Sequence, residues 1–306
     1  MKSLLCTALA ATAITSAFGQ VLTNNGNGLD FSDNFSAYSG SFSGWNSAWQ
    51  MDRRLPAGVT AGTYQGQSAV DFTVNNSNAD VASNNYFFNF QGIVRDVQDG
   101  SGNQAYVNAP WQVSASLYIS QDMLTGNSEY DSEIWARDNG IDNTLTASYP
   151  GIGWVHANAA DLASGTGNKT MVGGYSNDSS FTTGLIIDNL SPNDQNYPYL
   201  LVPQANVSAG WHNFSILSTG HSFVFSFDGT QVYDESGSAY SGAGLEGLTR
   251  VLLENENFND GGLNYAENPQ TDVYWSNVTV TPEPAEFAPF ALGIIGLVAR
   301  RRRRSG

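Results

Sequence analysis

Apolar and polar residues alternate with a period of two in several stretches of this chain. In the segment 111–119, one face would collect Trp111, Val113, Ala115, Leu117 and Ile119. Successive side chains of a β-strand point to opposite faces, so this spacing predicts a strand with one buried face. The folded region has no convincing 3.6-residue period and is rich in glycine, which excludes a helical bundle.

A tight turn joins two further predicted strands. Three phenylalanines share one face of the segment 223–227, and Asp228-Gly229 then leads into the segment 231–233. An Asp-Gly pair between apolar alternations is typical of a β-hairpin. Another strand is expected over residues 273–280. Many short strands separated by Gly, Asn and Asp turns predict a two-sheet sandwich or jelly roll.

The N-terminal residues have the pattern of a secretory signal. Lys2 supplies a positive charge, residues 4–13 form an apolar run, and Gly19 ends a small-x-small pattern of the kind that signal peptidase recognises. We therefore expect residues 1–19 to be a signal peptide, with cleavage between Gly19 and Gln20.

The C-terminal residues 281–306 form a second candidate targeting segment. A Pro-Glu-Pro motif within 281–284 precedes an apolar helix expected over 285–299, uncharged over 287–299, and an arginine cluster at 300–304. Thirteen apolar residues reach only about 20 Å as a helix, short of a hydrocarbon core of roughly 30 Å. Basic residues beside an apolar segment stay on the cytoplasmic side. The motif and cluster consist of Pro282, Glu283, Pro284, Arg300, Arg301, Arg302, Arg303 and Arg304.

This tail resembles the PEP-CTERM sorting signal of bacteria that make extracellular polysaccharide. The resemblance covers residues 281–304, and Thr281 stands where the family commonly has valine. It implies that an exosortase, a membrane-embedded cysteine peptidase, recognises and cuts the tail. The chain would then be held briefly in the inner membrane and end at the cell surface, in the outer envelope or outside the cell.

The composition of the remaining middle limits its chemistry. The single cysteine, Cys6, lies in the leader, so the mature protein has no disulfide, zinc thiolate or cysteine nucleophile. Residues 20–280 suffice for one large all-β domain.

The charge of this middle region is strongly negative. Of 28 acids two lie in the tail, and of 12 Lys and Arg six lie in the leader or tail, which leaves 26 acids, 6 bases and a net charge of −20. This excludes nucleic acid as a partner. The charge is compatible with neutral glycans and with Ca²⁺, and it also keeps an exported protein soluble.

Four segments resemble strands of concanavalin-A-like jelly rolls. The segment 31–35, Phe-Ser-Asp-Asn-Phe, resembles the opening strand, 211–216 and 223–229 the paired strands near the end, and 272–278 the closing strand. The resemblance implies a concanavalin-A-like jelly-roll β-sandwich over residues 20–280.

Three acids alternate at Glu129, Asp131 and Glu133, so they would line one face of a strand. Retaining glycosidases need two carboxyl groups about 5–5.5 Å apart. The Glu-x-Asp-x-Glu pattern resembles the catalytic strand of laminarinase- and lichenase-type β-glucanases. It implies that Glu129 is the nucleophile, that Asp131 tunes it and that Glu133 is the acid/base, although Tyr130 and Ser132 replace the usual bulky aliphatics. The alternative is a solvated acidic strand.

Aromatic residues offer a binding function without catalysis. Trp135 on the acidic strand, Trp154 in a Gly-rich stretch and Tyr149 are the candidates for exposed rings that stack on sugars. Trp211 and Trp275, within strand signals, are expected in the core.

Clustered oxygen ligands make Ca²⁺ a candidate cofactor. Asp138 and Asp142 lie close in sequence, and the segment 254–261 holds further acids and amides. Neither has EF-hand spacing, and turns rich in Asp and Asn are the alternative. The three histidines, at 156, 212 and 221, are scattered and expected to be structural.

The leading hypothesis is therefore an exported surface or matrix protein whose sandwich binds polysaccharide without catalysis. One alternative is an extracellular β-glucanase that uses Glu129 and Glu133, and another is a structural envelope protein without a ligand. The expected partners are signal peptidase, exosortase, extracellular polysaccharide and, transiently, the membrane.

Overall fold

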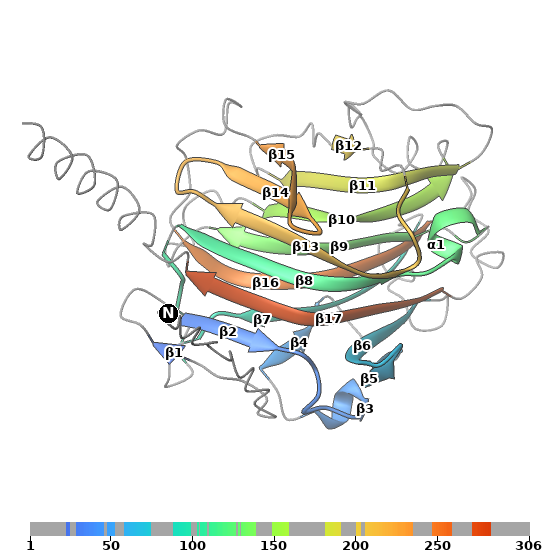
Figure 1. Cartoon of the computed structure of the whole chain (residues 1–306). Helices are drawn as coiled ribbons and strands as arrows, with labels where there is room; N and C mark the ends of the chain where they lie inside the picture. The colour runs from blue at the N-terminus through green and yellow to red at the C-terminus, as the bar shows by residue number, and fades with distance from the viewer. Residues whose placement is uncertain are drawn as a thin grey trace, which may run out of the picture.

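The computed structural model describes residues 23–24, 29–45, 48–52, 58–74, 88–98, 103, 105–108, 110–126, 128, 130–138, 149–158, 181–190, 200–202, 206–234, 247–258 and 271–282. Two antiparallel sheets lie face to face in this part of the chain (Figure 1). The predicted all-β sandwich is confirmed, in the two-layer architecture expected of a concanavalin-A-like jelly roll. The predicted signal peptide and the tail beyond Pro282 lie outside the described residues.

The first sheet has ten strands. In spatial order they are β15 (Thr230–Asp234), β14 (Phe223–Phe227), β13 (Gly210–Ser218), β8 (Trp111–Ile119), β17 (Thr271–Pro282), β6 (Gln67–Val74), β5 (Val59–Tyr64) and β3 (Gly40–Ser41). In addition, β2 (Leu29–Asp33) pairs with β17, and β1 (Thr23–Asn24) pairs with β2.

The second sheet has seven strands. In spatial order they are β12 (Leu200–Val202), β11 (Phe181–Leu190), β10 (Tyr149–Asn158), β9 (Tyr130–Asp138), β16 (Leu248–Phe258), β7 (Phe88–Asp96) and β4 (Trp49–Met51). Helical structure in the described ranges is limited to α1 (Asp122–Thr125) and the 3-10 turn η1 (Phe42–Gly44). Neither segment has the length and apolar character needed to cross a membrane.

The predicted strands and hairpin are confirmed. The face of β8 that the alternation predicts to be buried is fully buried. The alternating phenylalanines of β14 are at most 7% exposed. Asp228 and Gly229 have φ values of 48° and 73°, the pair of positive values that a type I′ hairpin turn requires. The turn joins β14 to β15 as expected.

The predicted closing strand lies at the centre of its sheet. β17 pairs with β8 on one side and with β6 and β2 on the other. The last strand of the domain therefore lies between strands from the first part and the middle of the chain. β17 continues through Thr281 and Pro282, the first two residues assigned to the sorting tail.

Three buried tryptophans donate hydrogen bonds from one sheet to the other. The indole N–H of Trp275 on β17 bonds to Asn255 on β16 at 3.0 Å, and that of Trp111 on β8 bonds to Asp138 on β9 at 3.3 Å. Trp49 on β4 donates to Asp33 of β2 at 2.8 Å. These bonds fix how the sheets lie over each other, because a buried polar group without a partner is costly.

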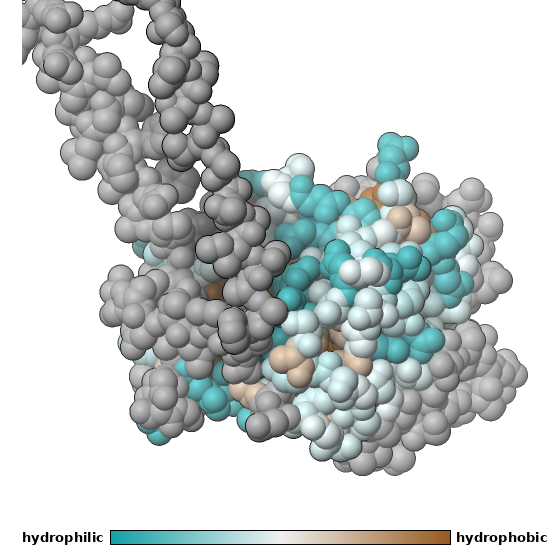
Figure 2. All heavy atoms as spheres, turned by 60° about the horizontal axis from the view of Figure 1, so that its bottom comes forward, coloured by the Kyte–Doolittle hydropathy of each residue, from teal (hydrophilic) through white to brown (hydrophobic). Residues whose placement is uncertain are grey.

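One side of the molecule is shown in Figure 2. Hydrophilic and intermediate residues dominate the coloured surface there, and apolar residues appear as small separate spots. The tryptophans and phenylalanines of the described chain are instead concentrated between the sheets.

Candidate functional site

The strand β9 carries the predicted acids on the outer face of the seven-stranded sheet. Tyr130 and Ile134 point into the core, so the alternating Asp131 and Glu133 point away from it. Both acids are only 4% exposed. Glu129 lies outside the described residues, so the catalytic roles assigned to the three acids stay predictions.

A further glutamate faces this strand. Glu254 on β16 is the direct cross-strand partner of Glu133. Side chains of such partners lie on the same face, with Cβ atoms about 4.5–5.5 Å apart. The sequence analysis offered the segment 254–261 either as Ca²⁺ ligands or as a turn; Glu254 instead belongs to a strand, as does the segment up to Phe258. Only the pairing register reveals this second carboxylate.

Trp135 lies beside Glu133 above a glycine of the next strand. Gly151 on β10 is the direct partner of Trp135. A Cβ added to Gly151 would lie 2.7 Å from Cδ2 of Trp135 and 2.9 Å from Oε2 of Glu133, so only glycine leaves room for both side chains. The indole and the carboxylate therefore lie side by side over the Gly151 backbone.

Tyr149 and Arg137 complete this cluster. Tyr149 packs on a small apolar group of Trp135, Val94 and Leu252, and the guanidinium of Arg137 lies 5.7 Å from the Tyr149 ring centre. Tyr149 and Arg137 are half-buried. Trp135 is only 7% exposed, so the expectation of a freely exposed indole was wrong. We call Asp131, Glu133, Trp135, Tyr149 and Glu254 the acid–aromatic face.

Burying carboxylates on this face costs free energy of hydration. Neighbouring outward positions hold the buried apolar residues Val155, Ile186 and Leu252. An ionised carboxylate loses hydration when it is buried, whereas an apolar side chain gains free energy at the same place. Buried acids at such positions are candidates for a functional site.

Trp154 does not belong to the acid–aromatic face. It points from β10 into the core, is 1% exposed, and donates its indole N–H to the carbonyl of Met123 at 3.0 Å. The prediction of an exposed stacking ring at Trp154 was wrong. The period of two on a strand shows which residues share a face, but not which of the two faces points into the core.

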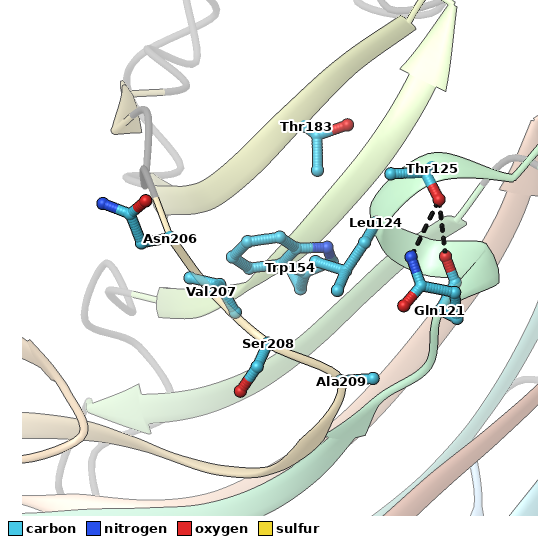
Figure 3. A pocket seen from close by; sticks show the side chains of 9 residues that line it. All are labelled: Gln121, Leu124, Thr125, Trp154, Thr183, Asn206, Val207, Ser208 and Ala209. Atoms are coloured by element: carbon cyan, nitrogen blue, oxygen red, sulfur yellow. Dashed lines mark hydrogen bonds between the residues drawn. The ribbon is translucent and has the colours of Figure 1, made fainter.

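Trp154 forms the inner wall of a pocket at one end of the sandwich. The pocket holds about 400 Å³ and is bordered by α1 on one side and by the residues before β13 on the other (Figure 3). Its other lining residues are Gln121, Leu124, Thr125, Thr183, Asn206, Val207, Ser208 and Ala209. Since Trp154 is almost fully covered, the pocket offers little aromatic surface to a ligand.

The predicted Ca²⁺ ligand Asp138 has a structural role instead. It is fully buried, and its two oxygens accept hydrogen bonds from Trp111 and from the backbone N–H of Gly247, the latter at 2.7 Å. Asp142 lies outside the described residues. No group of three or more His, Asp or Glu within the described ranges is placed to hold a metal ion. Asp138 does not fit a calcium site.

Two of the histidines have structural partners, as expected. His156 contacts the hydroxyl of Thr183 at 2.5 Å and the carbonyl of Gly126 at 3.2 Å, and burial lowers its pKa, which keeps it neutral near pH 7. His212 pairs with Asp228 at 2.7 Å.

The two tryptophans expected in the core differ in position. Trp275 is fully buried, as predicted. Trp211 alternates with the inward-facing His212 and Phe214 on β13, so it lies on the outer face of the ten-stranded sheet, half-buried against Tyr118 at 5.4 Å between ring centres. For Trp211 the prediction was wrong.

An acid with a shifted pKa lies on that same outer face. Burial, and secondarily the charge of Asp272, raise the pKa of Asp71 to about 7. Asp71 is the direct partner of Tyr274 on β17, and burial followed by the charges of Asp71 and Asp272 raises the pKa of the Tyr274 hydroxyl as well.

This pKa predicts how stability depends on pH. Folded Asp71 keeps a proton between about pH 4 and 7 that the unfolded chain releases, so its contribution to stability is full below that window and is lost as the pH rises through 7. We expect Asp71→Asn to raise the melting temperature at pH 8 by several degrees and to leave it nearly unchanged at pH 4. Thermal unfolding of both proteins across this range measures the difference; an equal shift at both pH values would contradict the assignment.

The sequence matches no protein-family profile, and no curated protein is similar to it. Solved structures with a similar fold include a glycoside hydrolase family 16 endo-glucanase from Bacteroides ovatus, at 12% identity over 82% of this chain and 99% of that one, with a TM-score of 0.49. A pseudo β-1,3-glucanase of Mycobacterium tuberculosis has 12% identity over 84% and 100%, also at 0.49. A non-specific endo-β-1,3(4)-glucanase has 10% identity over 85% and 94%, at 0.45. Similarity at these levels assigns no activity to this chain.

Proposed function

We propose that the protein binds neutral polysaccharide on the acid–aromatic face. The observation that carries the proposal is the placement of the Trp135 indole beside the Glu133 carboxylate above Gly151. Trp135 is 7% and Glu133 4% exposed, so the pair presents only a small part of its surface. That part offers the indole to the C–H face of a sugar and a carboxylate oxygen to a neighbouring hydroxyl. Tyr149 adds a second ring at the half-buried margin. The net charge of −20 for residues 20–281 favours neutral over anionic glycans.

Hydrolysis of β-glucan is the second candidate function, and the pair Glu133 and Glu254 favours it. Directly opposed residues on antiparallel strands place their Cβ atoms about 4.5–5.5 Å apart, from where two glutamate carboxyl groups can reach the roughly 5–5.5 Å of retaining glycosidases. One glutamate would then donate the proton and the other would attack the anomeric carbon. The sequence motif offers Glu129 as an alternative nucleophile.

Export and sorting belong to the same proposal. The predicted leader and the predicted Pro-Glu-Pro tail would carry the domain to the cell surface or beyond, where polysaccharide is available. This part is supported by the sequence motifs alone.

Binding is tested with Trp135→Ala and Gly151→Ala. Both variants should weaken binding to soluble mixed-linkage β-1,3/1,4-glucan by at least about tenfold, or 1.4 kcal/mol, in affinity electrophoresis, since one removes the ring and the other displaces it. Gly62→Ala is the matched control, because nothing lies within 4 Å of a Cβ at this strand glycine. Unchanged binding by both variants, with wild-type circular dichroism, would refute the site.

The same glucan separates binding from hydrolysis. If the face is catalytic, release of reducing sugar by the wild type is lost in Glu133→Gln and in Glu254→Gln while the polymer is still retained in the gel. If it only binds, no reducing sugar appears with any of the proteins.

A further inference from the structure

A row of aromatic and acidic side chains crosses the outer face of the ten-stranded sheet, on the opposite side of the sandwich from the acid–aromatic face. Trp211 on β13 is the direct partner of Tyr118 on β8, and the pairing of β8 with β17 places Tyr274 beside Tyr118. Asp71 on β6 is the partner of Tyr274. These four residues therefore span four adjacent strands, about 14 Å at a strand spacing of about 4.8 Å.

The rings of this row contact one another and leave half-buried surfaces. Tyr64 stacks on Tyr274 with ring centres 3.5 Å apart and an angle of 5°. Tyr118 meets both Tyr64 and Trp211 edge to face, at 5.0 and 5.4 Å. All four aromatic side chains are half-buried. We call these rings with Asp71 and Asp272 the aromatic row.

The two ends of the aromatic row hold polar atoms that the protein does not bond. The indole N–H of Trp211 and one carboxyl oxygen of Asp71 are buried atoms that have no hydrogen-bond partner among the described residues. A buried donor or acceptor without a hydrogen-bond partner destabilises the folded state by about 1–3 kcal/mol, so neither atom contributes to stability. A ligand with hydroxyl groups that covers the rings would supply the missing partners once a side-chain movement uncovers these two atoms.

The surrounding face favours a neutral hydroxylated ligand over a charged one. The strands β13, β8, β17 and β6 contain no lysine or arginine, and outward positions next to the row hold hydroxyl side chains such as Ser114 and Thr279, which bond to each other at 2.6 Å. Asp71 and Asp272 repel anionic polymers. Protein–protein interfaces have a larger apolar centre than these half-buried rings offer, so the row does not favour a protein partner.

We infer that the aromatic row is a second glycan-binding surface, and that the protein bridges two polysaccharide strands, one on each outer face of the sandwich. The bridging rests on the function proposed above, whereas binding by the aromatic row does not. Bridging follows from geometry, because the two sheets face away from each other and a single polymer segment contacts only one of them at a time.

The full chain and mixed-linkage β-glucan test this inference. Trp211→Ala and Asp71→Asn should each abolish one of two classes of binding site in equilibrium dialysis with glucan oligosaccharides, and Trp135→Ala the other. Precipitation of the polymer by the wild type should be lost in each of these variants, because a protein with one surface cannot link two strands. Asn213→Ala is the control, since Asn213 is exposed on the same face of β13 as Trp211.

The possible failures can be told apart. Wild-type binding and precipitation by both Trp211→Ala and Asp71→Asn would overturn the second surface and leave the first intact. Loss of all binding in these two variants, with no effect of Trp135→Ala, would instead refute the acid–aromatic face. A wild type that retains neither the oligosaccharides nor the polymer would refute both surfaces. Capture of a basic peptide in place of glycan at the aromatic row would refute the second surface alone.

Discussion

Asp33→Asn is expected to lower the free energy of unfolding by about 3–5 kcal/mol and the melting temperature on the order of 10 °C. Asp33 is 2% exposed and accepts hydrogen bonds from Trp49, from Tyr38 and from the guanidinium of Arg95 at 3.2 Å. Arg95 is equally buried, and desolvation lowers its pKa while Asp33 opposes that shift. The amide would leave the charge of Arg95 buried without its counter-ion.

This loss of stability should be far larger than the loss from breaking an Asp–Arg ion pair that is partly exposed. Asp96 and Arg250 pair at 2.5 Å, but their side chains are 21% and 32% exposed. Asp96→Asn is therefore expected to cost at most about 1 kcal/mol. Urea unfolding of both variants gives the comparison, and similar losses would show that burial of Arg95 is not the source of the effect.

Trp275→Phe is expected to cost roughly 3 kcal/mol. The change removes the donor to Asn255 across the sandwich, leaves a buried carbonyl unbonded and opens a cavity where the larger ring had been. Because the side-chain N–H₂ of Asn255 already lacks a partner among the described residues, the amide would then be entirely unbonded. Thermal and urea unfolding measure the loss.

A double variant tests the reason for this cost. Adding Asn255→Leu to Trp275→Phe replaces both polar partners with apolar groups, which should recover part of the lost stability. Trp45→Phe is a control, because Trp45 is only half-buried and its bond to Gly40 lies at the surface. Losses that simply add in the double variant would mean that the hydrogen bond between the sheets is unimportant.

Local patterns predicted the strands well, because their signals lie within a few residues. The alternation over β8 and β14 identified the buried faces, and Asp228-Gly229 identified a turn whose positive φ values few other pairs tolerate. The same rule placed Asp131 and Glu133 on one face of β9. These inferences required only the two-residue repeat of an extended chain.

Burial of single residues was predicted less well, because the repeat does not say which face is covered. Trp135 and Trp154 lie on neighbouring strands yet point to opposite sides of the sheet, and Trp211, expected inside, lies outside. Asp138 appeared to belong to an ion-binding turn and proved to be the acceptor for Trp111.

The sequence by itself therefore determined the all-β class, the main strands and the acids that share a face. Tertiary structure alone decided that Glu254 lies opposite Glu133, that Gly151 makes room beside Trp135, and that Asp33 meets Arg95 across 62 positions of chain. The physical reason is that strand register and sheet stacking depend on packing over the whole core, and a shift of one residue would turn every side chain of a strand to its other face.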